Sequence, residues 1–302
     1  MRAPGTDAQS CAQSRFDNDD DKPPEVVMND MAIAFIGGGN MARSLIGGLI
    51  AGGHSPDLIG VAEPDNSQRE FLRGRYGVHT CADNLEATAK AETIVLAVKP
   101  QILQGVARQL APAIQTRQPL VLSVAAGVRE PDLRRWLGGG SLALVRAMPN
   151  TPALVGGGAS ALFANPFVSE ERRRLAESLL RAVGVTVWVD DETLLDTVTA
   201  LSGSGPAYFF LVMEALEHAA LDLGLDADKA RLLTLQTAFG AAKMALESAD
   251  SPATLRARVT SPGGTTERAL AVLRDGGIEK LLTQAVVAAR QRARELGDLL
   301  GE

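Results

Sequence analysis

The sequence predicts an α/β protein, with an N-terminal Rossmann-type doubly wound sheet followed by an all-helical C-terminal dimerisation domain. Three observations support this prediction. A glycine-rich turn joins the first apolar run to a helical pattern within residues 31–50. Further short apolar runs alternate with helical patterns as far as residue 148, as strands and helices do in a doubly wound sheet. Beyond Glu192, strand patterns almost vanish and long, largely apolar helical patterns follow.

The composition narrows the classes of function. The 302 residues are 46% hydrophobic and 22% charged, which is ordinary for a globular chain and long enough for two domains. A net charge of −6 without a basic stripe argues against a nucleic-acid partner, and no apolar run is long enough to span a membrane. Two cysteines, Cys11 and Cys81, and three dispersed histidines predict neither a disulfide framework nor a metal site. A cytoplasmic location is the default expectation for such a chain.

The first thirty residues differ from the rest. They hold seven acidic residues against three basic ones, with almost no apolar periodicity. They lack the apolar centre of a signal peptide and the arginine-rich, acid-poor character of a transit peptide. We therefore expect residues 1–30 to form a disordered acidic tail. A dinucleotide-binding Rossmann domain is expected over residues 31–190 and a helical dimerisation and substrate domain over residues 191–302.

The first strand and helix flank the motif G-x-G-x-x-A. The run "MAIAFI", residues 31–36, is suited to a buried strand, and Gly37, Gly39 and Ala42 follow it. Gly37 permits the tight turn, Gly39 lets a pyrophosphate approach the backbone, and Ala42 lets the helix pack closely on the strand. The free N–H groups at the helix start would then bind the phosphates. The motif's place between a strand and a helix indicates dinucleotide binding.

The later strands end in small or polar residues, where ligands bind in such sheets. They are expected at residues 58–62, 93–98, 120–124 and 143–148, with two more at 159–164 and 186–189 that flank a helix at 170–182. Glu63 follows the second strand. A carboxylate there can accept hydrogen bonds from the ribose 2′-OH of NADH and would repel the 2′-phosphate of NADPH, unless Arg69 or Arg73 offsets it. Alternatively, Glu63 only begins the turn before Pro64.

The C-terminal part predicts five helices, at residues 206–223, 226–248, 252–259, 265–274 and 278–300. The first is apolar on nearly all sides, so it must be buried on most faces. The second carries a cluster of small residues that allow close helix packing, namely Ala238, Gly240, Ala241, Ala242 and Ala245. Helices of this kind suggest an interlocked dimer.

The stretch "TSPGGTT", residues 260–266, places two glycines and four hydroxyl residues directly before a helix. A helix cap requires only one such residue. The stretch therefore indicates a binding place for something small and negatively charged. If Gly264 is the N-cap, Glu267 falls at position N3, where it could bind one of the free N–H groups itself. We expect its side chain to point away.

Seven blocks occur in order: "AFIGGGNMA", "AVKP", "SVAAGV", "RAMPNTP", "LSGSGPAY", "GAAKM" and "SPGGTT". Together, over residues 31–300, they resemble the pyrroline-5-carboxylate reductase family. The resemblance implies reduction of the C=N bond of 1-pyrroline-5-carboxylate to L-proline, the last step of proline biosynthesis, with NADPH or NADH as cofactor. It also implies a homodimer with intertwined helical domains, which in many members assembles into a ring of dimers.

The resemblance further implies roles for individual residues. The pyrophosphate would lie against Ile36, Gly37, Gly38, Gly39, Asn40 and Met41. Glu63 would lie near the adenosine ribose, and Asn84 would reach the cofactor too. The nicotinamide side would be lined by Ala97, Val98, Lys99, Pro100, Val124, Ala125 and Ala126. The substrate would lie against Ser261, Gly263, Gly264, Thr265 and Thr266, facing the cofactor of the partner subunit. The family favours NADPH, whereas Glu63 argues for NADH.

The reaction requires the protein mainly to position the cofactor and the substrate. A protonated cyclic imine is already electrophilic at carbon, so the protein has to align the reacting atoms and exclude water. Thr266 is the candidate catalytic residue, through a hydrogen bond to the ring nitrogen; alternatively it is an ordinary first-turn threonine. Lys99 faces either the ligands or solvent, and Asn150 either contacts the nicotinamide or fixes its turn. Tyr208 and His218 are expected in the core or at an interface.

Two other functions fit the sequence less well. A β-hydroxyacid dehydrogenase-like oxidoreductase needs a base, usually a lysine on the first long helix of its second domain, and residues 206–223 contain no lysine. A nucleotide-sensing binding protein without turnover predicts a degraded substrate loop, whereas "SPGGTT" is complete. The reductase is therefore the function that the sequence predicts.

Overall fold

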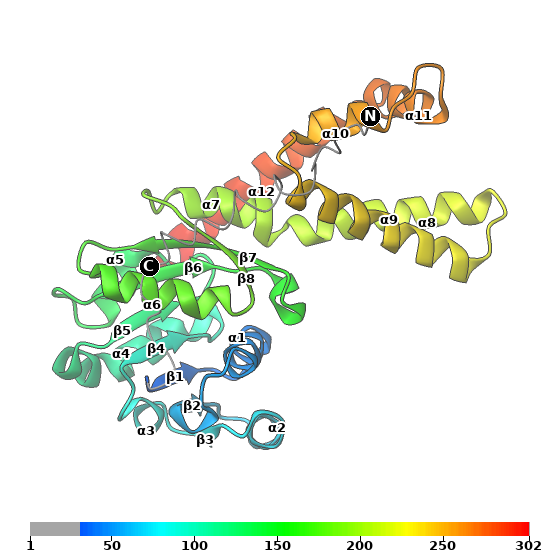
Figure 1. The fold of residues 1–302 in the computed structure, drawn as a ribbon. Coiled ribbons are helices and arrows are strands. Elements are labelled where there is room, and N and C mark those ends of the chain that lie inside the picture. The colour runs from blue at the N-terminus through cyan, green and yellow to red at the C-terminus, as the bar shows by residue number, and fades with distance from the viewer. Residues whose placement is uncertain (1–30, 302) are drawn as a thin grey trace, which may run out of the picture.

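The computed structural model describes residues 31–301, so the predicted acidic tail lies outside the described part of the chain. The described residues form an α/β domain and an elongated helical domain that projects from it (Figure 1). No helix within residues 31–301 is long and apolar enough to cross a membrane.

One sheet forms the centre of the α/β domain. Its strands are β1 (Ile33–Ile36), β2 (Ile59–Ala62), β3 (His79–Cys81), β4 (Thr93–Leu96), β5 (Leu120–Ser123), β6 (Leu144–Met148), β7 (Gly158–Ala164) and β8 (Gly184–Trp188). They are ordered β3-β2-β1-β4-β5-β6-β7-β8, and all pairs from β3 to β6 are parallel. The chain order reverses between β1 and β4, which creates the crevice where doubly wound sheets bind their ligands. The predicted fold class is confirmed.

Helices cover both faces of the sheet and enclose two cores. The helices of this domain are α1 (Asn40–Ala51), α2 (Asn66–Tyr76), α3 (Asn84–Thr88), α4 (Pro100–Arg117), α5 (Glu130–Trp136) and α6 (Glu170–Arg181). On one face, Phe35 of β1 packs in a cluster with residues of α1, α2 and α6. On the other face, Ile36 joins residues of α4 and α5. Neighbouring residues of a strand point to opposite faces, so the uninterrupted apolar run of β1 is buried on both sides.

The seventh strand runs against the others, because β7 pairs with β6 in an antiparallel register. A short 3-10 turn, η4 (Thr151–Val155), is the only element between these two strands. A parallel crossover needs a dozen or more residues, whereas this connection is shorter, so the chain must turn back. β8 then returns parallel to β7 through α6. The two additional strands predicted at residues 159–164 and 186–189 do extend the sheet.

The helical domain buries few of its own side chains. Its helices are α7 (Leu194–Val198), η5 (Thr199–Gly203, a π-helical turn), α8 (Gly205–Asp222), α9 (Ala227–Glu247), α10 (Pro252–Arg258), α11 (Thr265–Asp275) and α12 (Ile278–Gly301). In α8 and α9 the buried residues are Gly205 and Ala230. Large apolar side chains on both helices lie in the open, with Phe209 68% exposed and Phe239 62% exposed. A single chain therefore leaves the apolar faces of this domain without cover, which marks them as an interaction surface.

Charged side chains join the two domains. Arg146 of β6 is 7% exposed and forms an ion pair with Glu192, which precedes α7. The same carboxylate oxygen of Glu192 accepts a hydrogen bond from the backbone N–H of Glu130 at 2.5 Å. At its far end, α12 returns to the α/β domain, where Asp298 pairs with Arg129 at 2.8 Å.

Among the elements that were not predicted from the sequence are β3 and the π-helical turn η5. β3 is only three residues long, and its run "HTC" carries little apolar signal. The π-helical turn η5 lies directly before α8, where the sequence predicts no helix. Tyr208 holds this turn, because its hydroxyl group donates to the carbonyl oxygen of Ala200 at 3.0 Å.

Candidate functional site

The glycine loop lies between β1 and α1, at the carboxyl edge of the sheet. Gly37 has φ +98°, and a Cβ atom at this position would lie 2.8 Å from the carbonyl oxygen of Ala97. Only glycine fits such a conformation and such an approach. The loop is thereby held against the end of β4.

The start of α1 suits a pyrophosphate group. Gly39 is the N-cap and offers no side chain to the free N–H groups of the first turn. A Cβ atom on Gly39 would meet no heavy atom within 4 Å, and both Gly39 and Asn40 are exposed. Open space over an uncapped helix start is the arrangement that binds phosphate groups. The chain therefore fits a dinucleotide at this position.

The residues predicted to line the nicotinamide side adjoin this loop. The N–H of Ala97 donates to Ile36 at 2.8 Å, and the N–H of Val124 donates to Leu96 at 3.1 Å. Ala97, Val98, Pro100 and Val124 are half-buried, Ala125 is buried, and Ala126 is exposed. Lys99 is an exposed N-cap of α4. The structure thus gathers the ends of β1, β4 and β5 at one edge.

Glu63 lies at the end of β2 and contacts the glycine loop directly. Its Oε2 accepts from the N–H of Gly38 at 2.9 Å and its Oε1 from the N–H of Asp65 at 3.0 Å. Asp65 caps α2, and its hydrogen bonds, first from the Ser67 hydroxyl and then from the Gln68 N–H, hold the pKa of the Asp65 carboxyl below its usual value. The turn that carries Glu63 is therefore fixed by local hydrogen bonds.

Three arginines surround this turn, of which Arg43 was not singled out from the sequence. Arg43 of α1 donates to the carbonyl oxygen of Gly38 at 3.0 Å and stacks on the ring of Phe71 at 4.4 Å. The sequence feature that could have identified Arg43 is its position in the first turn of α1, directly after the glycine motif. Arg69 donates to the backbone carbonyl of Glu63 at 2.7 Å, and Arg73 donates to Thr80 at 2.9 Å.

Two predicted asparagines have partners within the chain. Asn84 begins α3, and its amide nitrogen donates to Gln109 of α4 at 2.8 Å. Asn150 is buried, donates to the carbonyl oxygen of Ser202 at 3.0 Å and accepts from the N–H of Ala159 at 2.9 Å. Its amide thus fixes the turn after β6 against the π-helical turn η5.

The predicted substrate loop, residues 260–266, precedes α11, which has Gly264 as its N-cap. Gly263 has φ +73°, a conformation that glycine adopts without strain. Ser261, Thr265 and Thr266 are exposed, and their hydroxyl groups make no hydrogen bond within residues 31–301. These groups are free to bind a ligand.

Glu267 does not point away from the loop, so that expectation was wrong. Its Oε2 accepts a hydrogen bond from the N–H of Gly263 at 2.7 Å. The reason is local, because position N3 places a glutamate within reach of the free N–H groups ahead of the helix. The N–H of Gly264 also donates to the carbonyl oxygen of Ser261 at 3.0 Å, so two of the backbone donors expected to bind the substrate are bound within the chain.

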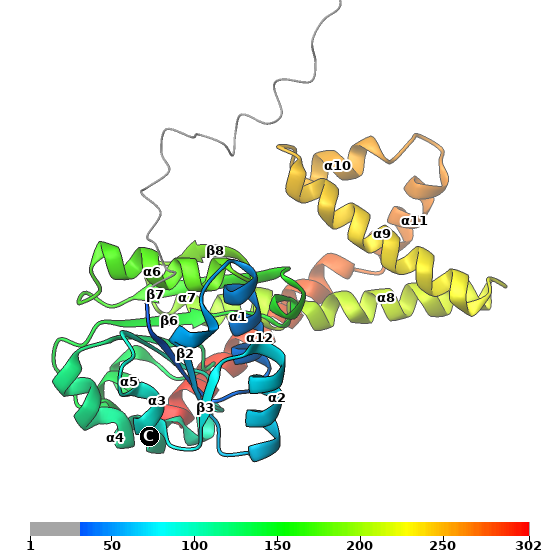
Figure 2. The same ribbon diagram turned by 60° about the horizontal axis from the view of Figure 1, so that its bottom comes forward.

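The glycine loop and the substrate loop lie far apart in one chain. Figures 1 and 2 both show α10 and α11 at the far end of the helical domain, away from the carboxyl edge of the sheet. The structure thus brings the predicted cofactor residues of β1, β2, β4 and β5 together, and does not bring them to the predicted substrate residues of the same chain.

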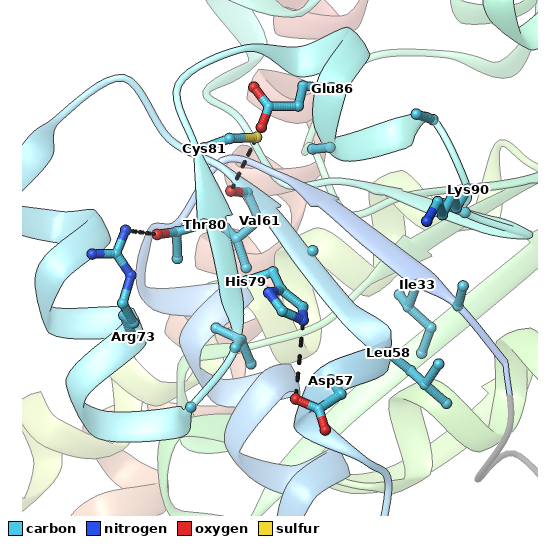
Figure 3. Close-up of a pocket in the computed structure, with 17 residues that line it drawn as sticks. Ile33, Asp57, Leu58, Val61, Arg73, His79, Thr80, Cys81, Glu86 and Lys90 are labelled. Atoms are coloured by element: carbon cyan, nitrogen blue, oxygen red, sulfur yellow. Dashed lines mark hydrogen bonds and ion pairs between the residues drawn. The ribbon is translucent and has the colours of Figure 1, made fainter.

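A groove of about 810 Å³ lies elsewhere on the α/β domain, over β2 and β3 (Figure 3). Asp57, Arg73, His79 and Cys81 are among its lining residues, whereas the glycine loop is not. Partial burial raises the pKa of the Cys81 thiol, with the nearby charge of Glu86 as a second cause. The glycine-loop residues do not line this groove, so it is separate from the dinucleotide crevice.

Comparisons with known proteins decide the family. The model described as pyrroline-5-carboxylate reductase dimerisation matches residues 192–296, and the model described as NADP oxidoreductase coenzyme F420-dependent matches residues 32–127. A pyrroline-5-carboxylate reductase of Pseudomonas aeruginosa is 50% identical over 275 residues, which cover 91% of this chain and all of that protein. The chain belongs to the pyrroline-5-carboxylate reductase family. A reductase of the same name from Pasteurella multocida is 44% identical over 90% of this chain and all of that protein.

Solved structures of family members share the fold. A pyrroline-5-carboxylate reductase of Coxiella burnetii has a TM-score of 0.85 and 48% identity, covering 89% of this chain and 99% of its own. The Plasmodium falciparum pyrroline carboxylate reductase, with NADP bound, has a TM-score of 0.78 and 27% identity over 89% of this chain and 99% of its own. The family predicted from the seven sequence blocks is confirmed. The exposed helices α8 and α9 lie within the dimerisation match, which accounts for their uncovered apolar faces.

Proposed function

We propose that this protein reduces 1-pyrroline-5-carboxylate to L-proline, with NADH or NADPH as the source of hydride. Within the family fold, the observation that supports this proposal most strongly is the start of α1, which has no side-chain cap and faces open space at Gly39. It provides a place for the dinucleotide beside the strand ends where chemistry occurs in such sheets. A cytoplasmic location remains our expectation for the enzyme.

The chain's own residues would hold the cofactor along the carboxyl edge. The N–H groups at the start of α1, from Gly39 to Met41, would bind the pyrophosphate. Ala97 to Pro100 and Val124 to Ala126 would form the wall beside the nicotinamide ring, which supplies hydride when bound. Asn84 and Asn150 would contribute by shaping the loops after β3 and β6, where their amides have partners.

The substrate loop would bind the carboxylate and orient the ring. The N–H groups at the start of α11, with the hydroxyls of Ser261 and Thr265, would bind the carboxylate, since a helix start favours an anion. Thr266 would hydrogen-bond the ring nitrogen and hold the imine carbon toward the hydride donor. No acid–base pair is needed, because the protonated imine is already electrophilic.

Each complete site would combine two chains. The two loops lie far apart in one chain, and the apolar faces of α8 and α9 call for a second copy. In a homodimer, the substrate loop of one protomer would face the glycine loop of its partner. A ring of such dimers is a further proposal, carried by the family resemblance.

An absorbance assay tests this function. Purified protein with 1-pyrroline-5-carboxylate should oxidise NADH or NADPH and form L-proline, and no oxidation with either cofactor would overturn the proposal. Thr266→Ala should lower kcat/KM roughly 10- to 100-fold, as expected for loss of one hydrogen bond that orients the reacting ring. Thr260→Ala is the matched control, because the Thr260 hydroxyl already donates to Arg256 within the chain. Full activity of Thr266→Ala would remove Thr266 from its role.

A further inference from the structure

Glu63 places a fixed negative charge at the adenosine end of the dinucleotide crevice. Both of its carboxylate oxygens accept backbone hydrogen bonds, from Gly38 at 2.9 Å and from Asp65 at 3.0 Å. The loop passes so close that a Cβ atom on Gly38 would lie 3.3 Å from Oε2. Two hydrogen bonds to rigid backbone leave this side chain little freedom to swing aside. A cofactor that follows the glycine loop must therefore pass this carboxylate.

The neighbouring arginines are engaged elsewhere. Arg69 binds the backbone carbonyls of Glu63 and Pro64, both at 2.7 Å, and Arg73 binds Thr80 across the turn. Arg43 binds the carbonyl oxygen of Gly38 and the side chain of Gln68 while it stacks on Phe71. Within residues 31–301, none of these guanidinium groups forms an ion pair with the Glu63 carboxylate. Its negative charge is not neutralised by an arginine.

We infer that Glu63 makes this enzyme prefer NADH over NADPH. This inference rests on the proposed function, since it assigns the adenosine end of that same cofactor site. A ribose 2′-OH can donate to the carboxylate, whereas a 2′-phosphate would meet it as a like charge. At about 4 Å in water, one such charge pair corresponds to about fivefold in affinity, and a phosphate carries nearly two charges. A preference of about tenfold or more for NADH therefore results.

The binding of NAD⁺ and NADP⁺ to the full chain, measured by isothermal titration calorimetry without substrate, tests the inference. The wild-type protein should bind NAD⁺ about tenfold more tightly. In Glu63→Gln, the ratio of the two Kd values should fall to near one, mainly because NADP⁺ binds better. Glu70→Gln is the matched control: it removes an exposed carboxylate of α2 whose partner is Asn66, and should leave the ratio unchanged. Equal or tighter binding of NADP⁺ by the wild type would overturn the inference, as would an unchanged ratio in Glu63→Gln.

Salt provides a second test that needs no variant. If Glu63 controls the preference, added salt screens the repulsion, and the Kd ratio of NADP⁺ to NAD⁺ falls between 10 and 500 mM salt. If Arg43 or Arg69 controls it, salt weakens the attraction for the 2′-phosphate and the ratio rises, which refutes the inference. The outcome is separate from that of the catalytic assay. A protein that selects NAD⁺ but leaves 1-pyrroline-5-carboxylate unreduced would keep this inference and lose the proposed function.

Discussion

Replacing Gly37 or Gly39 of the dinucleotide loop with alanine should harm different properties of the protein, namely folding stability and cofactor binding. At Gly37, φ is +98° and the new Cβ atom would lie 2.8 Å from the carbonyl oxygen of Ala97. The backbone conformation costs about 1–2 kcal/mol for an L-residue, and relieving the contact costs about 1–3 kcal/mol more. Gly37→Ala should therefore lose about 2–5 kcal/mol of folding free energy, a large part of the total stability of a domain.

Gly39 offers the opposite case. Its φ is −71°, which alanine adopts freely, and a Cβ atom there would touch no heavy atom within 4 Å. Exchanging glycine for alanine at an N-cap costs less than about 1 kcal/mol. The methyl group would instead occupy the open space where the pyrophosphate approaches the backbone. Gly39→Ala should keep its stability and bind NAD⁺ at least about tenfold more weakly, a loss of about 1.4 kcal/mol.

Two measurements separate these outcomes. Urea denaturation without cofactor reports stability, and calorimetric titration with NAD⁺ reports binding by the folded variants. We expect the stability defect in Gly37→Ala and the binding defect in Gly39→Ala. The reasoning fails if Gly37→Ala is as stable as the wild type, or if Gly39→Ala binds NAD⁺ with unchanged affinity.

Three further predictions concern other residues. Glu192→Ala leaves the buried Arg146 without its partner and should lower the free energy of unfolding, measured by urea denaturation, by about 3 kcal/mol. Glu192→Gln should lower it less, because glutamine still accepts a hydrogen bond, and equal losses in the two variants would contradict this. Because the pKa of the Cys81 thiol is raised, iodoacetamide should modify Cys81 more slowly in the folded than in the urea-unfolded protein at pH 8, and this difference in rate should shrink as the pH rises. Mass spectrometry of the Cys81 peptide measures both rates, and equal rates at pH 8 would contradict the prediction. Glu267→Gln removes a negative charge beside the substrate loop and should lower the KM for 1-pyrroline-5-carboxylate about two- to fivefold at unchanged kcat, and an unaltered KM would show that the charge is not felt there.

The sequence predicted the α/β domain well because its signals are local. The apolar run before Gly37 and the helical pattern after it each specify one element, and the structure has both within two residues. β3 escaped prediction because three residues at a sheet edge need no apolar run. The reversal at β7 follows from the short connection after β6, a length that could have been counted.

Side-chain partners were harder to predict, since they depend on atoms from distant elements. The sequence placed Glu63 at the end of β2, yet its bond to Gly38 becomes visible only once β1 and β2 are paired. The sequence allows Asn150 either to contact the nicotinamide or to fix its turn, because its hydrogen bond to Ser202 joins two domains and no local pattern encodes it. The orientation of Glu267 was predicted wrongly, because at position N3 the hydrogen bond to a free backbone N–H outweighs the repulsion expected from a bound carboxylate.

The distance between the glycine loop and the substrate loop in one chain has a genetic consequence. If each site joins loops from two protomers, a chain damaged at Gly39 and a chain damaged at Thr266 are each inactive as homodimers, yet their mixed dimer contains one site with no damage and one with both. Random pairing of the two chains makes about half of all dimers mixed, each with one intact site of two, so co-expression should restore about a quarter of wild-type activity. Two defective alleles of this gene would then complement each other inside a single protein.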